Sequence, residues 1–335
     1  MTAETPVLAR LVPIRRWKSV FESYGQEFVI LAALVVLFVG VGLYNPRFIS
    51  TNNLTSMFVG NAYIAIAAIG MSMVIISGNI DVSVGSLIGV LGTISGTMAV
   101  SGYPIILCWL APILIGMAIN AGVGVLVAYV RIPSIVVTLG MLSILKGGLI
   151  SVTGGAWISG MPADYMIAQK RFLTIPALGF AGIPSSVCFM IVLTILAALW
   201  MKHSVFGRTI YAIGGNPEAA RVSGIRIQPS IVGVFTLHGM FAGVAAVLFA
   251  TQLQVIQSTV PPNLELTVIT ASVVGGVSIL GGTGTVIGST LAAILFAAIG
   301  SSLVFLNVSA YWLRAVQGLM ILATVLADMA RRRRI

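Results

Sequence analysis

Ionisable and amide side chains stand inside an otherwise apolar sequence, and Asp81 is the clearest of them. In the string SGNIDVSVGS (77–86) it lies between two long apolar runs, close to Asn79 and Ser83. A charged side chain at the centre of a bilayer costs roughly 3 kcal/mol or more, so such a residue indicates a function or a buried partner. Two interpretations have equal support and are compatible. Asp81 caps the helix that follows, or it lines a polar cavity at a helix break.

Further polar residues lie in or near the apolar runs, and their chemistry suits hydrogen bonding to a hydroxylated solute. Each of them could equally bond a neighbouring helix. The candidate path residues are Asn61, Asn79, Asp81, Ser83, Asn120, Gln252, Gln254 and Glu265.

Patterns for catalysis, nucleotide binding and metal binding are missing from the sequence. No glycine precedes a lysine, so there is no P-loop, and neither GxSxG nor HExxH occurs. His203 and His238 lie far apart, and Asp164 and Asp328 fall in a loop and a tail rather than at facing depths of two helices. We therefore expect a chain without catalytic residues, cofactor or metal.

Composition places the chain in a membrane. It is 58% hydrophobic and 8% charged, and its mean hydropathy is +1.08, which excludes an ordinary soluble domain. Its 37 glycines fit helices that pack closely through small residues, as the pair Gly239 and Gly243 would allow. Cys108 and Cys188 lie in apolar runs and are expected to be packing residues.

Ten apolar runs have membrane length, which predicts an all-α, polytopic membrane protein. Those at 54–101 and 265–306 are interrupted by glycines and polar residues, so some of their helices are expected to be broken or re-entrant. The runs are 28–44, 54–77, 84–101, 104–130, 133–152, 184–201, 230–253, 265–281, 285–306 and 311–330.

Basic residues lie mostly on one side of this topology. Thirteen Lys and Arg fall in inner segments and three in outer ones, so the positive-inside rule puts both termini in the cytoplasm. The net charge of +10 follows from this topology and does not indicate nucleic acid. The predicted parts are a cytoplasmic tail (1–27), a membrane domain (28–330) and a basic cytoplasmic tail (331–335). The first span is expected to be a retained anchor.

Two connecting segments are long enough to carry structure. The outer segment 153–183 contains MPADYMIAQKRF, for which we predict a short surface helix that meets a partner or simply tethers two spans. The inner segment 202–229 is expected to form a helical hairpin. In it, Asn216 suits an N-cap, Pro217 the first helical position, Glu218 the first turn and Gly224 the stop. A helix of two turns needs a surface to lie against, either this chain's own helix ends or a partner.

Several strings resemble the ribose-type permeases of bacterial ABC (ATP-binding-cassette) importers for monosaccharides. They are NPRFISTNNL (45–54), SGNIDVSVGS (77–86), IPSIVVTLGML (132–142), FGRTIYAIGGNPEAARVSGI (206–225) and VVGGVSILGGTGTVIGS (273–289). The resemblance implies a type II importer-like bundle with Asn79 to Ser83 beside the solute's path. It also implies that the hairpin contains a coupling helix that binds a cleft on an ATPase. The residues matching that helix are Gly215, Asn216, Pro217, Glu218, Ala219, Ala220, Arg221 and Gly224.

The same resemblance implies partners in the bacterial inner membrane and on both sides of it. These are a cytosolic subunit that binds the ATP, a second permease copy or sister permease, a periplasmic sugar-binding protein, and membrane lipid. Asn79 together with TGGAWISGMPADY (153–165) resembles the autoinducer-2 permeases. Rhamnose permeases have similar loops, so the resemblance leaves the identity of the solute undecided. The rival functions are an ion-coupled secondary transporter that uses Asp81 and an intramembrane enzyme.

Overall fold

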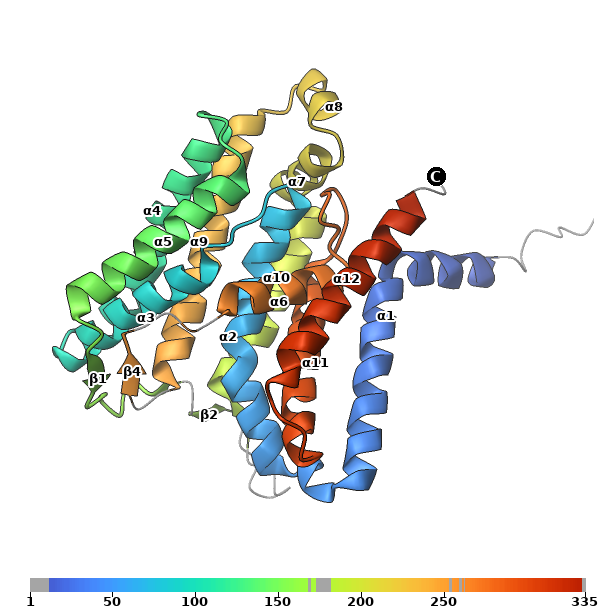
Figure 1. Cartoon of the computed structure of the whole chain (residues 1–335). Helices are drawn as coiled ribbons and strands as arrows, with labels where there is room; N and C mark the ends of the chain where they lie inside the picture. The colour runs from blue at the N-terminus through green and yellow to red at the C-terminus, as the bar shows by residue number, and fades with distance from the viewer. Residues whose placement is uncertain are drawn as a thin grey trace, which may run out of the picture.

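The computed structural model describes residues 12–167, 170–172, 182–252, 255–258, 261 and 263–332, and helices dominate it (Figure 1). The helices are α1 (Val12–Tyr44), η2 (Pro46–Ile49, a 3-10 turn), α2 (Thr51–Ile76), α3 (Val84–Val100), α4 (Ile105–Ala128), α5 (Ser134–Thr153), α6 (Ser185–His203), α7 (Val205–Gly215), α8 (Pro217–Val222), α9 (Ile227–Thr251), α10 (Leu264–Val274), α11 (Val286–Phe305) and α12 (Trp312–Arg332). The short strands are β1 (Trp157–Ser159), β2 (Arg171–Phe172), β3 (Ile183–Pro184) and β4 (Val255–Gln257).

Eight of the described helices are long and apolar enough to cross a membrane, and α3 and α10 are shorter apolar helices. A hydrocarbon core of about 30 Å needs roughly 20 helical residues. The 17 residues of α3 and the 11 residues of α10 therefore reach only part of the way. The prediction of an all-α polytopic protein with broken helices is confirmed.

Each short helix follows a long helix, α3 after a coil and α10 after a segment that contains β4. α2 ends at Ile76, and Gly78 then takes φ +83°, a conformation that glycine adopts at little cost. α9 ends at Thr251, and Asn263, with φ 60°, precedes α10. In Figure 1 α3 and α10 lie at middle height, while α2 and α9 run past them in opposite directions.

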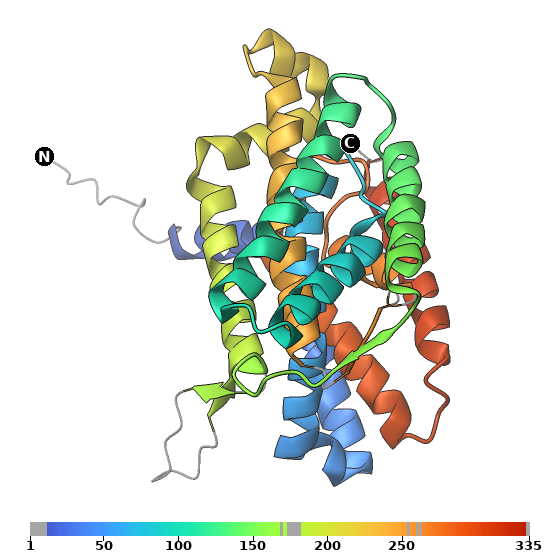
Figure 2. The ribbon, with the colours of Figure 1, turned by 90° about the vertical axis from the view of Figure 1, so that its left-hand side faces the viewer.

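Two ends of the molecule can be told apart by what they carry. The hairpin end carries α7 and α8, and the strand end carries β1 and its antiparallel partner β4. Figure 2 shows the gold hairpin and the green strand at opposite ends of the long helices. The start of the α1 span and the last turns of α12 lie toward the hairpin end (Figure 1).

The centre of the bundle is α9, which packs against α2, α3 and α4. At the crossing with α4, a Cβ added to Gly116 would lie 2.5 Å from the carbonyl oxygen of Gly239, and one on Gly243 would lie 2.5 Å from Cα of Ile113. The close packing expected at the Gly239 and Gly243 pair is confirmed. Such an approach strengthens dispersion contact where lipid provides no hydrophobic drive for association.

The prediction of a short surface helix in MPADYMIAQKRF is wrong for the described residues. Residues 163–165 form a turn, and 171–172 form β2, which pairs with β3. The reason is Tyr165, whose ring is fully buried and whose hydroxyl lies 2.7 Å from Ser95 Oγ on α3. That contact draws the segment down onto the bundle, which a surface helix would not allow.

Two predicted boundaries also differ from the structure. The helix of the first span begins at Val12 rather than near residue 28, so most of the expected tail continues the helix. The run 265–281 is helical only to Val274, because Gly276 has φ +93° and the chain then forms a glycine-rich loop. The division into tails and membrane domain stays a prediction, and residues 1–11 and 333–335 lie outside the described residues.

Candidate functional site

Asp81 lies at the entry of α3 and is completely buried. Its Oδ1 accepts hydrogen bonds from the backbone N–H of Ser83 at 2.8 Å and from the Ser83 hydroxyl at 2.6 Å. An aspartate that accepts from the backbone two residues ahead stabilises a turn into a helix. The N-cap residue of α3 is Ser83, and no side chain makes a capping bond to this helix, so the Asp81 carboxylate holds the turn before the helix instead of capping it. Whether it also borders a solute's path stays a prediction.

The second carboxylate oxygen of Asp81 faces two other helices. Asn120 on α4 donates to Oδ2 at 3.3 Å, and His238 Nε2 on α9 lies 3.4 Å from the same atom. The two atoms lie within ion-pair distance but are not aligned as a hydrogen bond. All three side chains are fully buried, so this cluster joins the entry of α3 to the central helices.

The coil before α3 is held from α5 as well. Ser134 Oγ accepts from the backbone N–H of Ile80 at 3.2 Å, and Thr138 Oγ1 accepts from that of Val82 at 3.1 Å. These bonds satisfy backbone groups that a break in a membrane helix leaves without helical partners. The segment from Asn79 to Ser83 is thus fixed by side chains from its neighbours.

The first turns of α3 and α10 are in contact, and Glu265 lies at this contact. A Cβ added to Gly85 would overlap Glu265 Oε2 and would lie 3.3 Å from Cβ of Leu264. Glu265 is half-buried and stands in the first turn of α10. Helix N-termini carry partial positive charge, which favours a carboxylate there. This carboxylate can accept hydrogen bonds from a hydroxylated solute that reaches the junction.

The other predicted path residues are more scattered. The Asn61 amide donates to the carbonyl of Met57 in its own helix at 2.8 Å, and the Asn79 amide donates to Ser77 Oγ at 3.1 Å. Gln252 caps the end of α9 at the strand end. Gln254 lies outside the described residues. The structure therefore brings Asp81, Ser83 and Asn120 together and leaves Asn61 and Gln252 elsewhere.

His238 belongs to this cluster and Thr138 supports the coil before α3, although no sequence pattern predicted either residue. A histidine in an apolar span was itself a signal, because such a residue needs a buried partner. His238 has no second ligand residue at metal-binding spacing, so a metal motif does not reveal it. Among the described residues, no group of three or more His, Cys, Asp or Glu side chains could hold a metal ion.

The hairpin end carries the second set of predicted residues. The Asn216 side chain accepts from the backbone N–H of Ala219 at 3.0 Å, Pro217 occupies the first turn, and Gly224 has φ +83° after the helix. Glu218 and Arg221 form an exposed 2.6 Å ion pair one turn apart. These groups explain why six residues hold a helical conformation.

One face of α8 lies against the protein and the other is open. Ala220 is buried, and the backbone N–H of Ile225 donates to its carbonyl at 3.0 Å. Pro217, Glu218, Ala219, Arg221 and Val222 are exposed, with Val222 80% exposed. An aliphatic side chain beside a charge pair on a projecting helix is suited to bind a partner.

A helical membrane bundle whose broken helices meet with their N-termini beside a carboxylate has the architecture of membrane transport proteins. The family model described as branched-chain amino acid transport system / permease component matches residues 53–325. The chain belongs to this family. The resemblance drawn from the sequence is confirmed: the chain is the permease subunit of an ABC importer, a multi-pass inner-membrane protein and not an enzyme.

Three similar relatives are each an autoinducer 2 import system permease protein LsrC. Those of Salmonella typhi and Yersinia enterocolitica are 37% identical over 309 residues, which cover 92% of this chain and 87% and 84% of those proteins. That of Escherichia coli is 34% identical and covers 92% of this chain and 88% of that protein. No solved structure matches the chain.

Proposed function

We propose that this permease imports autoinducer-2 or a closely related sugar-like solute. The similarity to three autoinducer-2 import permeases over nearly the whole chain carries this proposal. The predicted path fits such a solute, because carboxylate, amide and hydroxyl groups accept and donate hydrogen bonds to hydroxyls. Rhamnose and pentoses are the competing solutes.

The proposed path passes the junction of α3 and α10. Glu265 supplies an acceptor there, and the N-termini of both short helices offer partial positive charge that suits carbonyl and hydroxyl oxygens. Asp81, Asn120 and His238 hold the start of α3 in position without needing to touch the solute. Ser83, Asn79 and Gln254 remain candidate contacts.

The proposed source of energy is a cytosolic ATPase subunit that binds α8. The exposed face of this helix supports the proposal, as does the match of the hairpin to the coupling segment of the resembled family. A second permease copy or sister permease and a periplasmic binding protein would complete the importer. The hairpin end is then cytoplasmic, and both termini lie on that side, as the basic residues predict.

A second candidate function has one observation in its favour. Asp81 and His238 form an ionisable pair between helices, which is a usual feature of proton-coupled transporters. Uptake into vesicles separates the two functions. An importer of the proposed kind needs the ATPase subunit and ATP, whereas a secondary transporter works with an ion gradient alone.

The test of the solute is competition during uptake. Membrane vesicles with the permease, its ATPase and its binding protein should accumulate labelled autoinducer-2, and unlabelled rhamnose or ribose in excess should not reduce the rate. Inhibition by one of those sugars, without transport of autoinducer-2, would assign the permease to that sugar instead.

A further inference from the structure

The glycine-rich connection between α10 and α11, residues 275–285, is the point where the hairpin meets the rest of the protein. We call it the junction loop. A Cβ added to Gly282 would lie 2.6 Å from Cα of Gly215 at the end of α7, and one on Gly281 would lie 2.9 Å from the carbonyl oxygen of Gly214. The Tyr211 hydroxyl of α7 donates to the carbonyl of Gly284 at 2.9 Å. The backbones of hairpin and loop therefore touch directly.

The junction loop also contacts the end of α2. The backbone N–H of Gly282 donates to the carbonyl of Ile76 at 2.8 Å, and a Cβ added to Gly214 would overlap that same oxygen. Any side chain at these glycines would hold the three segments apart. In addition, Gly281 and Gly282 have φ values near +80°, which disfavour any other residue. A displacement of α7 must therefore be transmitted to the loop by hard backbone contact.

Polar side chains from α1 and α12 tie the loop from its other side. The hydroxyl of Thr285 donates to Glu27, and the hydroxyl of Ser278 donates to Asp328 Oδ2 at 2.6 Å. Gln26 donates to the carbonyl of Val274 at 3.2 Å. Two of the chain's eight acidic residues thus bind this single loop, and Glu27 is only 9% exposed.

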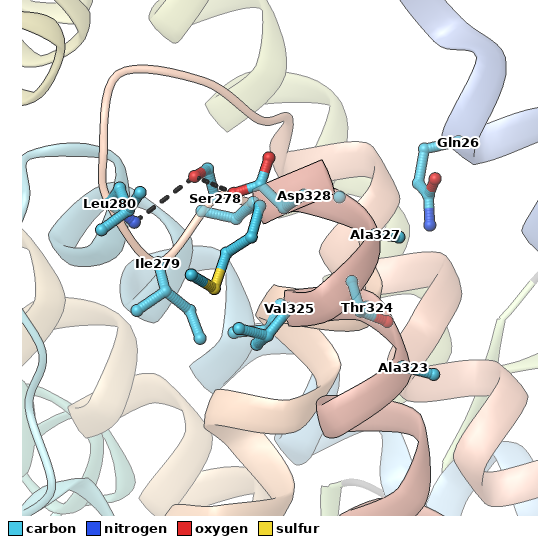
Figure 3. A pocket seen from close by; sticks show the side chains of 13 residues that line it. Gln26, Ser278, Ile279, Leu280, Ala323, Thr324, Val325, Ala327 and Asp328 are labelled. Carbon is cyan, nitrogen blue, oxygen red and sulfur yellow. Dashed lines mark hydrogen bonds between the residues drawn. The ribbon is translucent and has the colours of Figure 1, made fainter. Parts of the chain in front are cut away.

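A cavity of about 370 Å³ lies between the loop, α12 and the start of the α1 span. Figure 3 shows Ser278, bonded to Asp328 and Leu280, at one side of the cavity, with Gln26 at the far side and Ile279 and Val325 below Ser278 in this view. The cavity leaves the loop room to shift, while the Ser278 to Asp328 bond defines where it rests.

We propose that the junction loop relays the movement of the hairpin to α10, and that Glu27 and Asp328 are positioning residues that set its resting place. The loop continues directly from α10, whose first turn carries Glu265, so a shift at Gly275 moves a rigid helix of 11 residues. This inference rests on the proposed function, since it requires that an ATPase drive the hairpin. It adds the route by which a movement of the hairpin would reach the contact between α3 and α10, where the solute is proposed to pass.

The test is a reversible lock across the loop in the assembled importer. The variant carries Ser278→Cys and Asp328→Cys in a background with Cys108→Ala and Cys188→Ala. Oxidation should form a disulfide and lower ATP-dependent uptake at least tenfold below that of the same variant in its reduced form, while ATP hydrolysis continues, and a reductant should return uptake to that reduced level. Single-cysteine variants under the same oxidant serve as controls. The background protein reports on the proposed function separately, because it must show ATP-dependent uptake without any lock.

Unchanged uptake with the disulfide formed would overturn the relay, and so would failure of the disulfide to form in the resting importer. A second variant, Gly282→Ala, should lower the solute imported per ATP hydrolysed about tenfold. Gly25→Ala, whose added Cβ meets nothing within 4 Å, should leave that ratio unchanged. An unchanged ratio in Gly282→Ala, with the complex assembled, would also contradict the relay.

Discussion

His238 Nε2 lies 3.4 Å from Asp81 Oδ2, and both side chains are completely buried. The pair connects the middle of α9 to the coil that starts α3, and Gly70 of α2 makes room for the histidine ring, since an added Cβ there would lie 2.6 Å from Nδ1. Elements α2, α3 and α9 therefore meet at this pair. This arrangement fixes the position at which α3 begins.

Removal of one partner of this pair should destabilise the protein. Asp81→Ala leaves Asn120 and Ser83 without their acceptor and His238 without its neighbouring carboxylate, and breaking a buried pair costs about 3–5 kcal/mol. Thermal unfolding in detergent should show a lower midpoint. In a double-mutant cycle with His238→Ala, the combined loss should be smaller than the sum of the single losses. Strictly additive losses would mean that the two residues do not interact.

The carboxylate at the junction of the short helices should affect transport more than stability. Glu265→Gln keeps the shape of the side chain and removes its charge, so we expect assembly and insertion to be normal and uptake to fall about tenfold. Asn61→Asp, on a side chain bonded within its own helix, tests whether any change of charge near the path has this effect. Normal uptake by Glu265→Gln would remove Glu265 from the path.

The stability of the protein should be sensitive to side-chain volume where α3 and α10 pack together. Gly85→Ala introduces a methyl group where Glu265 and Leu264 already lie, and overpacking of this kind costs about 1–3 kcal/mol. Gly122→Ala is the matched control on α4, because nothing lies within 4 Å of its added Cβ. Unfolding midpoints of the two variants should differ by several degrees, and equal midpoints would contradict the contact.

At the strand end, Tyr165→Phe should cost about 1 kcal/mol, because a buried hydrogen bond to Ser95 is lost. Tyr103→Phe removes a hydroxyl from a tyrosine that is 54% exposed and should have little effect. Thermal unfolding checks both. A Tyr165→Phe variant as stable as the wild type would show that the hydroxyl does not hold the segment.

Much of the fold could be predicted because a bilayer restricts the possible structures. Apolar length, glycine positions and charge asymmetry indicated ten apolar runs, with interruptions in the stretches 54–101 and 265–306, and the caps of α8 followed from Asn216, Pro217 and Gly224. The contact partners could not be predicted. His238 and Asp81 are 157 positions apart, and only tertiary packing brings them together.

Tertiary contacts that the sequence does not reveal also explain why the prediction of a helix around Tyr165 was wrong. Its local sequence permits a helix, but burial of the ring against α3 outweighs the local preference. Likewise, the sequence showed a glycine-rich segment at 275–285 without indicating that Glu27 and Asp328 bind it. Long-range contacts between single polar side chains leave no periodic pattern in a sequence.

ATP hydrolysis by a partner subunit should drive this permease through its contact with α8, and a measurement of ATP-coupled uptake tests this. Proteoliposomes with the permease, its ATPase and its binding protein should accumulate labelled autoinducer-2 only with ATP. Glu218→Lys and Arg221→Glu should each insert normally, lower ATPase binding at least tenfold and stop uptake. Asp164→Lys, an exposed charge reversal near the strand end, should do neither. Uptake that persists without the ATPase, or that is unchanged in both α8 variants, would contradict the account.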